Sequence, residues 1–262
     1  MASEITPQEI SRKLSELAEA GRKPATVNRY RALLSLVFSV ANRNEKLTIN
    51  PVRFVRHRRE NNSRIRFLNE KEEQSLREVI TKKFPDKEPE FDLALHTGMR
   101  RGEQFRLRWQ DIDLRLGIIT IPRSKHGEKR HIPINSVARR ALTVLWRKRD
   151  DSGYVCSGPK SSRGKDSRRW FEKEVILGSG VKDFRWHDLR HTFASRLVMA
   201  GVHLRTVQEL MGHKTIDMTV RYSHLAPGHQ MEAVERLAGK PTDTSTDTKE
   251  KLDNEAEIGK QS

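Results

Sequence analysis

The sequence predicts a mainly α-helical protein with a small antiparallel β-sheet. Apolar residues recur at helical spacing along several segments, and helix-capping or helix-ending residues stand at the borders of those segments. One region instead alternates apolar and polar residues on both sides of a polar tip. At 262 residues the chain is long enough for one large domain or two modest ones.

The first clear helical segment is "TVNRYRALLSLVFSVA". Thr26 stands where it can cap this helix, and Pro51 in "TINP" stops the pattern because proline cannot continue a helix. Apolar residues recur at i, i+3, i+7, i+10 and i+14, which predicts one buried stripe. The stripe consists of Val27, Tyr30, Leu34, Val37 and Ala41.

A basic segment follows, "VRFVRHRRENNSRIRF", in which apolar periodicity is almost absent. We interpret residues 53–66 as a linker. A solvated connection and a connection lying along phosphates, where each arginine would release counterions, are compatible interpretations, and we expect both. Its arginines are Arg53, Arg56, Arg58, Arg59, Arg64 and Arg66.

The segments after the linker predict further helices and a hairpin. "FLNEKEEQSLREVI" predicts a helix capped by Asn69, "PEFDLALHTG" a helix that ends at Gly98, and "MRRGEQFRL" the start of another. "GIITIPRSKHGEKRHIPI" predicts a β-hairpin with "SKHGEK" at its tip. Helices resume at "NSVARRALTVLWRKR". The alternating residues of the hairpin are Ile119, Ile121, Ile132 and Ile134.

The charge of the chain favours a polyanionic partner. There are 51 Lys+Arg against 35 Asp+Glu, a formal net charge of +16, and the excess lies before residue 241. Nucleic acid or an anionic membrane surface would fit, and a merely soluble basic protein is the alternative on composition alone. Neither an apolar run of about 18 residues nor a signal-peptide region is present, so nucleic acid is favoured over a membrane surface as the partner. The single Cys156 excludes a disulfide framework and suits the cytoplasm.

The stretch "RWHDLRHTFASRL" raises the choice between a metal site and an anion site. His187 and His191 stand four residues apart, which puts both on one helix face. A zinc site of this kind needs a glutamate after the first histidine and a third ligand, but position 188 is Asp. Arg190 shares the face, and a guanidinium repels a divalent cation whereas it donates to phosphate. The alternative, a solvated polar face, would be favoured if the motif stood alone. The opposite, buried stripe would be Leu189, Phe193 and Leu197.

Three further motifs each have an ordinary structural explanation when taken singly. "TGMRRGE" puts Arg100 at a helix start, where N–H groups favour anions, but Arg100 and Glu103 also fit a surface ion pair. "LMGHKT" predicts that a helix ends at Gly212, which places His213 at the turn after it, where a lone histidine is most often a cap. "MTVRYSHL" carries Tyr222 on a short helical stretch, where a buried aromatic residue usually belongs to the core.

The ordered set of these motifs is more specific than any one of them. "TGMRRGE", "RSKHGEKRHIPI", "HDLRHTFAS", "LMGHK" and "TVRYSHL" stand in an order and at separations that closely resemble the tyrosine recombinases, in particular phage-type integrases. The resemblance covers residues 64–238. More weakly, residues 24–51 are similar to the second half of the family's helical core-binding domain. The set is Arg100, Lys125, His187, Arg190, His213 and Tyr222.

The resemblance implies a catalytic role for each member of the set. Tyr222 would attack phosphorus, forming a 3′-phosphotyrosine and releasing a 5′-hydroxyl, with His187 as proton acceptor. Lys125 would protonate the departing 5′ oxygen. Charge develops on the non-bridging oxygens, so donors there dominate catalysis. These donors would be Arg100, Arg190 and His213. Glu103 and His191 would support them, and we expect neither metal nor cofactor nor ATP.

The resemblance also implies a domain organisation. We expect a partial helical core-binding module over residues 1–52, shorter than the family's four-helix module, and the basic linker over 53–66. A catalytic domain over 67–240 and a disordered tail over 241–262 would follow. The segment "HQMEAVERLAG", with Met231, Val234 and Leu237, would dock on a neighbouring subunit or, equally, on its own domain.

The implied partner is double-stranded DNA carrying attachment sites, bound by a homotetramer in the bacterial cytoplasm, with an accessory DNA-bending protein as a further candidate and no membrane. Phosphate contacts set position rather than sequence. The residues expected to make them are Arg29, Arg53, Arg56, Arg58, Arg59, Arg64 and Arg66.

Three functions fit this sequence. The first is a site-specific recombinase that integrates or excises mobile-element or prophage DNA. The second is an enzyme of the same chemistry that relaxes DNA or resolves chromosome dimers. The third is a DNA-binding accessory protein that no longer cleaves, against which the complete set of catalytic residues argues.

Overall fold

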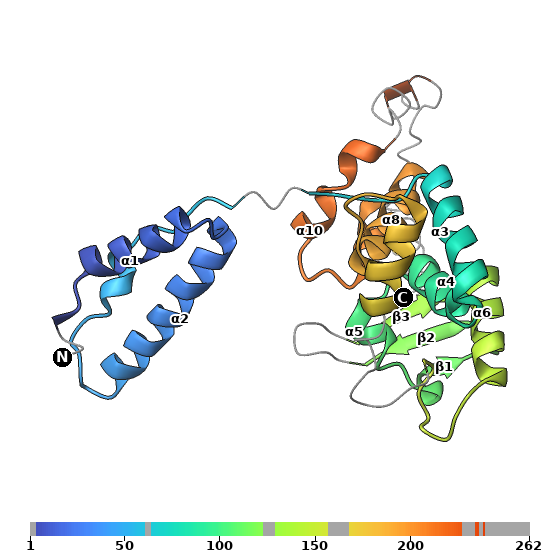
Figure 1. Cartoon of the computed structure of the whole chain (residues 1–262), viewed down its shortest axis with the longest axis horizontal. Coiled ribbons are helices and arrows are strands. Elements are labelled where there is room, and N and C mark those ends of the chain that lie inside the picture. The colour runs from blue at the N-terminus through green and yellow to red at the C-terminus, as the bar shows by residue number, and fades with distance from the viewer. Residues whose placement is uncertain are drawn as a thin grey trace, which may run out of the picture. The chain divides into compact units, whose positions relative to one another are not determined.

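The computed structural model describes residues 4–60, 64–122, 129–156 and 168–226, together with residues 234, 235 and 238. The chain forms two compact units, Met1–Arg64 and Ile65–Ser262, whose elements are labelled in Figure 1. Both are mainly helical, and the second contains a small antiparallel sheet, so the predicted fold class is confirmed. Lys125, most of the segment 229–239 and the tail 241–262 lie outside the described residues.

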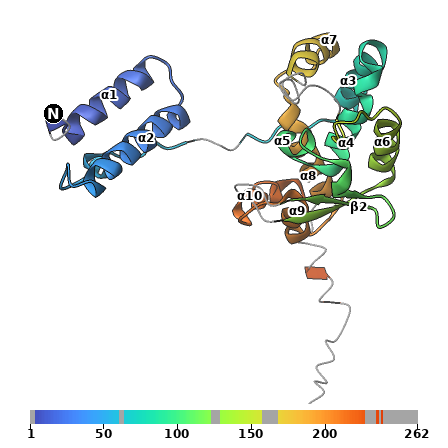
Figure 2. The same ribbon diagram turned by 90° about the horizontal axis from the view of Figure 1, so that it is seen from below.

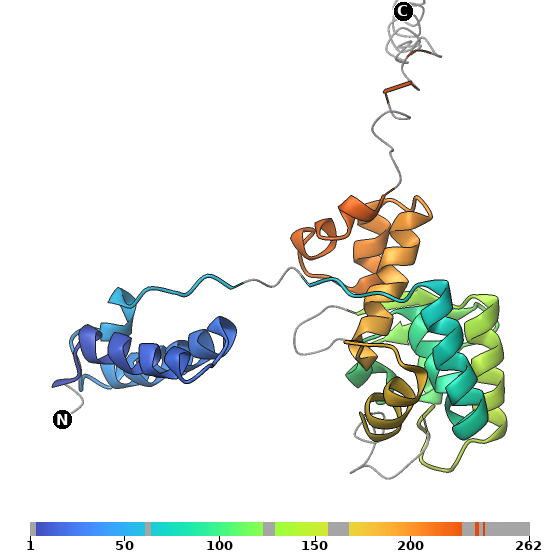
Figure 3. The same ribbon diagram turned by 45° about the horizontal axis from the view of Figure 1, so that its top comes forward.

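Unit 1 consists of two helices and a short 3-10 helix. These are α1 (Pro7–Glu19), α2 (Pro24–Arg43) and η2 (Pro51–Phe54). The two α-helices lie side by side, as Figure 3 shows. Thr6 and Glu9 cap α1 reciprocally, since each side chain accepts a hydrogen bond from the other residue's backbone N–H. The core between the elements consists of Ile10, Leu14, Val27, Phe38, Val52 and Val55.

Two predictions about α2 are wrong in detail. The helix begins at Pro24 and not after Thr26, because proline at the first helical position needs no N–H partner there. Tyr30 and Val37, expected on the buried stripe, are 46% and 57% exposed. Within the described part of the chain, α1 and the segment after Asn50 cover only the side of α2 that carries Val27 and Phe38.

The linker is narrower than the expected range 53–66. Val55 is buried in the core of unit 1, and the Arg58 N–H donates to Asn28 Oδ1 at 3.0 Å. At the other end, Arg66 belongs to unit 2, where its guanidinium pairs with Glu72. Residues up to Arg58 therefore belong structurally to unit 1, although their composition alone resembles a linker.

Unit 2 begins with helices whose borders follow the predicted signals. Asn69 caps α3, since its Oδ1 accepts a hydrogen bond from the Glu72 N–H at 2.8 Å. Gly98 ends α4 in the left-handed conformation, with φ of 60°. The elements up to the sheet are α3 (Glu70–Lys83), η3 (Pro85–Lys87), α4 (Glu88–Thr97), α5 (Arg101–Gln104) and η4 (Trp109–Asp111).

The sheet has three antiparallel strands in the order β1-β2-β3. The predicted hairpin is confirmed, with Ile119 opposite Ile132, while the two-residue strand β1 was not predicted. The inward face of the sheet packs against Leu93 of α4 and Leu142 of α6. The bounds are β1 (Ile112–Asp113), β2 (Ile118–Ile121), β3 (Arg130–Pro133) and α6 (Ser136–Arg147).

Among the remaining elements, α8 is buried along much of its length and contacts α4, α9, η5 and η6. Figure 2 shows α7 beside α3 and α10 beside α9. No helix in the described ranges is long and apolar enough to cross a membrane. These elements are η5 (Arg168–Val175), α7 (Ile176–Ser179), α8 (Trp186–Met199), α9 (Leu204–Met211), α10 (Asp217–Val220) and η6 (Ser223–Leu225).

Candidate active site

Three arginines from three different elements meet at the C-terminal end of α9. Arg130 of β3 donates from Nε to the Leu210 carbonyl at 3.2 Å. Arg190 of α8 donates from Nη2 to the Met211 carbonyl, and Arg100, which precedes α5, donates from Nη2 to the Gly212 carbonyl at 3.0 Å. The last carbonyls of a helix lack intrahelical partners and carry partial negative charge, so guanidinium groups suit them. We call Leu210, Met211 and Gly212 the carbonyl turn.

Arg190 is the most buried of the three arginines, with 4% of its surface exposed. Its Nη1 also donates to the Gly98 carbonyl at 2.6 Å, which ties the end of α4 to the end of α9. Burial and the positive charges of Arg100 and Arg130 lower the pKa of Arg190 to about 9, so it stays charged at neutral pH. A guanidinium has five N–H groups, so others remain that can address an anion.

Glu103 holds two of the arginines in place. Its Oε1 accepts from Arg100 Nη1 at 2.9 Å and from Arg130 Nη1 at 3.1 Å. Its Oε2 accepts from Arg130 Nη2 at 2.6 Å and from the Arg100 backbone N–H at 2.9 Å. Burial alone would raise the pKa of Glu103, but these hydrogen bonds from Arg130 and Arg100 lower it to about 2. The carboxylate is therefore ionised throughout the physiological range.

His213 follows the carbonyl turn directly. Gly212 adopts the left-handed conformation with φ of 60°, so the chain leaves α9 and turns the imidazole toward α10. His213 Nδ1 lies 2.8 Å from the hydroxyl of the buried Thr219. Burial, together with the charges of Arg190 and Arg100, lowers the pKa of His213 to about 3. His213 is therefore neutral at physiological pH and can donate through Nε2 while Nδ1 accepts from Thr219.

Tyr222 stands between α10 and η6 with its ring in the core. It is 1% exposed and packs in one cluster with Val198, Val207 and Met211. Its hydroxyl is 2.5 Å from Nδ1 of His191 on α8. Burial raises the pKa of Tyr222, an effect that the charges of Arg221 and Arg190 oppose. The core explanation is thus correct for the ring, while the hydroxyl has a specific polar partner.

The residue that meets the tyrosine differs from the one expected. From the family resemblance we expected His187 as the proton acceptor and a supporting role for His191. In the structure His191 Nδ1, and not His187, lies within hydrogen-bond distance of the Tyr222 hydroxyl, and the His187 ring lies edge-on to the His191 ring at a centroid distance of 5.1 Å. Residues 187 and 191 share a helix face, but the one-turn offset decides which of them reaches the phenol.

Most of the expected site residues meet around the carbonyl turn, while Lys125 lies outside the described residues. Arg130 and Thr219 were missed. A signal for Arg130 existed: it stands two residues before the buried Ile132 on a strand, so both face inward, and a buried arginine needs partners. Asp188, left unassigned, accepts from the Arg185 N–H at 2.9 Å and so caps α8. The residues that meet are Arg100, Glu103, Arg190, His191, His213 and Tyr222.

The expected DNA-contacting arginines differ in their surroundings. Arg29, Arg53, Arg56, Arg59 and Arg64 are exposed. The other two have partners inside their own unit, where Arg58 Nη2 donates to Ser15 Oγ at 3.0 Å and Arg66 pairs with Glu72.

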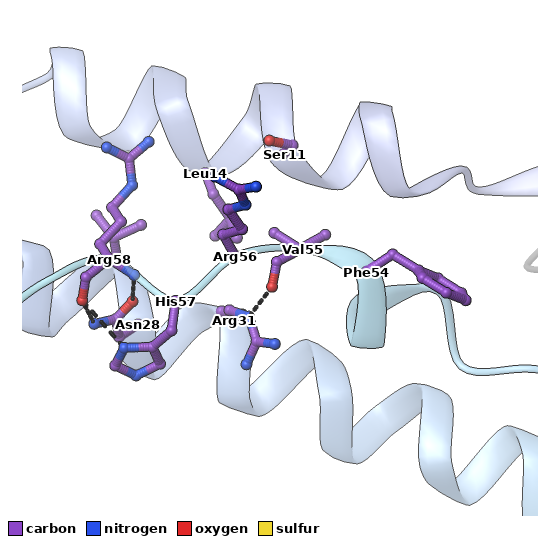
Figure 4. A pocket seen from close by; sticks show the side chains of 10 residues that line it. Ser11, Leu14, Asn28, Arg31, Phe54, Val55, Arg56, His57 and Arg58 are labelled. Atoms are coloured by element: carbon purple, nitrogen blue, oxygen red, sulfur yellow. Dashed lines mark hydrogen bonds between the residues drawn. The ribbon is translucent and has the colours of Figure 1, made fainter.

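The segment 54–58 lies along a groove of about 270 Å3 between α1 and α2, shown in Figure 4. On the α2 side, Arg31 donates to the Val55 carbonyl at 2.8 Å. Arg56 and Arg58 extend toward α1, whereas His57 points toward α2. Unit 1 thus fixes the course of its basic segment through hydrogen bonds to the backbone.

The chemistry available at the carbonyl turn is that of fixed cations, a neutral imidazole and a phenol. The described residues contain no group of three or more His, Cys, Asp or Glu side chains that could hold a metal ion. Guanidinium groups offer several N–H donors to the oxygens of a phosphate, and the buried setting strengthens each interaction.

Comparison with known proteins identifies the family of the chain. Residues 66–229 match the model of the phage integrase family. The shufflon-specific DNA recombinase of Escherichia coli is 33% identical over 234 residues, which cover 85% of this chain and 58% of that protein. The integrase of Salmonella phage P22 is 31% identical over 158 residues, which cover 56% of this chain and 41% of that protein. The chain thus spans about half the length of these curated relatives.

Solved structures show the same fold. An integrase of the Tn1549 transposon in complex with circular intermediate DNA superposes with a TM-score of 0.71 at 20% identity, covering 89% of this chain and 85% of that one. A lambda integrase dimer bound to a COC′ core site gives a TM-score of 0.68 at 24% identity, covering 84% and 80%. With its matching family model and its ordered site, the chain belongs to the phage integrase family.

Proposed function

We propose that this chain is a site-specific DNA recombinase that breaks and rejoins DNA through a 3′-phosphotyrosine. The observation that carries the proposal is the 2.5 Å contact between Tyr222 and His191, made beside the arginines around the carbonyl turn. A phenol with a proton acceptor on one side and fixed cations nearby is what an attack on a phosphodiester needs.

The proposed cleavage step transfers the scissile phosphorus from the 5′ oxygen to the Tyr222 hydroxyl oxygen. Tyr222 Oη forms a bond to phosphorus, and the bond from phosphorus to the 5′ oxygen breaks. His191 Nδ1 takes the phenolic proton, and Lys125 gives a proton to the departing 5′ oxygen. The phosphotyrosine retains the free energy of the diester, so attack by a new 5′-hydroxyl reverses the step and rejoins a strand without ATP.

The arginines and His213 stabilise the charge that develops during this step. Arg100 and Arg190 would donate to the non-bridging oxygens, and His213 would add a third donor through Nε2. These groups are fixed before the substrate arrives, because the carbonyl turn and Glu103 already orient them. Fixed donors of this kind cost little reorganisation when the charge appears, which is why they accelerate such reactions.

Tyr222 is covered by neighbouring side chains, since only 1% of its surface is exposed. A phosphate can therefore reach its hydroxyl only after some of these neighbours move. We infer that DNA binding moves neighbouring side chains away from the Tyr222 hydroxyl while its contact with His191 is kept, and that this opening controls when cleavage begins.

The substrate we propose is double-stranded DNA at attachment sites of a mobile element, acted on in the bacterial cytoplasm by a homotetramer. A DNA-bending accessory protein would bring distant sites together. The shufflon-specific recombinase and the P22 integrase support this class of substrate. Light scattering measures the mass of the complex with DNA and so tests the tetramer. We expect a mass that corresponds to four protein chains for each pair of sites.

A covalent-trapping experiment tests the chemistry. The protein is incubated with nicked fragments of host genomic DNA in EDTA and quenched with SDS, and the DNA that remains attached to protein is sequenced. We expect EDTA-resistant adducts at a defined sequence from the wild type and none from Tyr222→Phe. Salt-sensitive binding without adducts would show a DNA-binding protein that does not cleave, and the proposal would be wrong.

Product analysis then separates recombination from a topoisomerase-like activity. Supercoiled plasmids carrying two copies of the recovered sequence are incubated with the protein. Recombined junctions are expected, whereas relaxed circles alone would favour the topoisomerase-like enzyme.

A further inference from the structure

We propose that Arg130 is a positioning residue for the proposed recombinase, and that it acts through two contacts at once. One contact fixes the Glu103 carboxylate that holds Arg100, and the other fixes the carbonyl turn that presents His213. The inference rests on the proposed function, since Arg100 and His213 matter for catalysis only if the chain cleaves DNA.

Arg130 is directed inward, with only 10% of its side chain exposed. Its two Nη groups donate to the two oxygens of Glu103 at 3.1 and 2.6 Å, which is the bidentate geometry that fixes a carboxylate in one plane. Its Nε donates to the Leu210 carbonyl at 3.2 Å. All three nitrogens therefore donate within the protein, and with its side chain largely buried Arg130 is placed to orient its neighbours.

Arg100 depends on this arrangement more than the other arginines do. It is 35% exposed, and the contacts that orient its guanidinium are with Glu103 and the Gly212 carbonyl. Each oxygen of Glu103 is shared between Arg100 and Arg130. Without Arg130 the carboxylate can rotate about its last bond, and the Arg100 side chain, which carries considerable rotamer freedom, loses its fixed partner.

The backbone of the carbonyl turn is packed directly on Arg130. A Cβ at position 212 would lie 2.7 Å from Arg130 Cδ and 2.9 Å from its Nη1, closer than side chains tolerate. Arg130 is thus in contact with Gly212 as well as hydrogen-bonded to Leu210. The residue before His213 is therefore held by the same side chain that holds the partner of Arg100.

A first test measures single-turnover cleavage at saturating DNA, using a duplex with the sequence recovered by trapping. Arg130→Met is compared with wild type on the ordinary phosphodiester and on a methylphosphonate at the scissile position. The methylphosphonate lacks one charged non-bridging oxygen, so its cleavage depends less on Arg100. We expect a loss of about 10²-fold on the phosphodiester and a loss of only a few fold on the methylphosphonate.

Equal losses on both substrates would mean that Arg130 serves only general stability, and the inference would be wrong. Arg130→Lys, which keeps the charge but cannot bridge Glu103 and Leu210 together, provides a milder variant in case Arg130→Met does not fold. Arg139→Met is the matched control, because Arg139 also donates to a backbone carbonyl, that of Leu114 at 2.7 Å, outside the site. It should cleave both substrates at the wild-type rate.

A second test needs no DNA, and so separates this inference from the proposed function. Nitrogen-15 NMR of the arginine side chains reports hindered rotation of the Arg100 guanidinium through the splitting of its Nη signals. We expect hindered rotation in wild type and in Arg139→Met, and averaged signals in Arg130→Lys. Retained splitting in the Arg130 variants would overturn the inference even if the wild type cleaves DNA. Averaging would support it even if no cleavage is found.

Discussion

His191 and Tyr222 set the chemistry at the scale of single residues. The imidazole meets the phenol at 2.5 Å, and burial raises the pKa of Tyr222. A buried phenol ionises poorly unless a base takes its proton as the bond to phosphorus forms. In the proposed reaction His191 accepts this proton and Lys125 donates one to the leaving group. Experiments can test these two roles separately.

The first prediction concerns His191→Asn. We expect its single-turnover cleavage rate to fall about 10²-fold, because the proton acceptor is lost. A substrate with sulfur in place of the 5′ oxygen has a leaving group that needs no protonation. That substrate should restore the cleavage rate of Lys125→Met, whereas cleavage by His191→Asn should stay slow. Rescue of both variants alike would contradict the assignment of His191 as proton acceptor.

The second prediction concerns pH and His213, whose pKa is about 3 in the folded protein. An unfolded histidine has a pKa of about 6.5, so below that value the unfolded chain binds a proton that the folded chain does not. Stability is therefore lost as the pH falls from 6.5 toward 3, by about 2 kcal/mol at pH 5.

Denaturant unfolding of wild type and His213→Gln at pH 7 and pH 5 checks this prediction. His187 and His96 also have a lowered pKa, in each case first through burial, so wild type and variant share their contribution. The loss of stability between the two pH values should be smaller in His213→Gln. Equal losses would show that the native His213 titrates as it does in the unfolded chain.

At the scale of elements, the end of α9 organises the site. A helix C-terminus exposes carbonyls, and here each of three successive carbonyls accepts from an arginine of a different element. This turn requires glycine at position 212 for two reasons, its left-handed φ of 60° and the closeness of Arg130.

The third prediction separates those two reasons. Gly180 also ends a helix in the left-handed conformation, with φ of 70°, but a Cβ there would meet nothing within 4 Å. Gly180→Ala should destabilise the protein by about 1 kcal/mol through the backbone alone. Gly212→Ala should add about 1–3 kcal/mol from the close contact.

Thermal unfolding measures the stability of both variants, and cleavage assays measure their activity. Gly212→Ala should lose activity as well as stability, whereas Gly180→Ala should keep wild-type activity. A Gly212→Ala protein as stable and as active as Gly180→Ala would show that Arg130 can move aside without consequence.

Elements defined by local signals were predictable from the sequence. Asn69, Gly98 and Gly212 end or begin helices as expected, because capping depends on residues within one turn. The contact of Arg130 with Leu210 joins residues 80 positions apart, and no local pattern encodes it. The exposed Tyr30 shows a related limit, since apolar spacing reveals a face but not whether another element covers it.

At the scale of the whole molecule, the two units divide the proposed work. Unit 2 contains the complete described part of the site, while unit 1 and the adjoining segment carry exposed arginines on a short helical scaffold. Composition predicted the basic character of the segment, but its packing onto unit 1 depends on Val52 and Val55, which are too few to show periodicity.

The salt dependence of DNA binding tests which arginines contact phosphates. Each neutralised phosphate releases counterions, so a plot of log affinity against log salt has a slope of about −0.9 per contact. For a random-sequence duplex we expect a steep slope for the wild type. Removal of one exposed arginine should reduce the steepness by the equivalent of about one phosphate contact or less. The variants to compare are Arg29→Gln, Arg53→Gln, Arg56→Gln and Arg59→Gln. Arg66→Met is the matched control.

Arg66 is equally basic in the sequence, but its guanidinium pairs with Glu72 at 2.5 Å and lies 5.3 Å from the centroid of the Phe184 ring. Because its charge is already neutralised inside unit 2, its removal should leave the slope unchanged. A slope that falls as much for Arg66→Met as for Arg56→Gln would show that DNA breaks the pair with Glu72. A slope near zero for the wild type would contradict DNA binding through phosphates altogether.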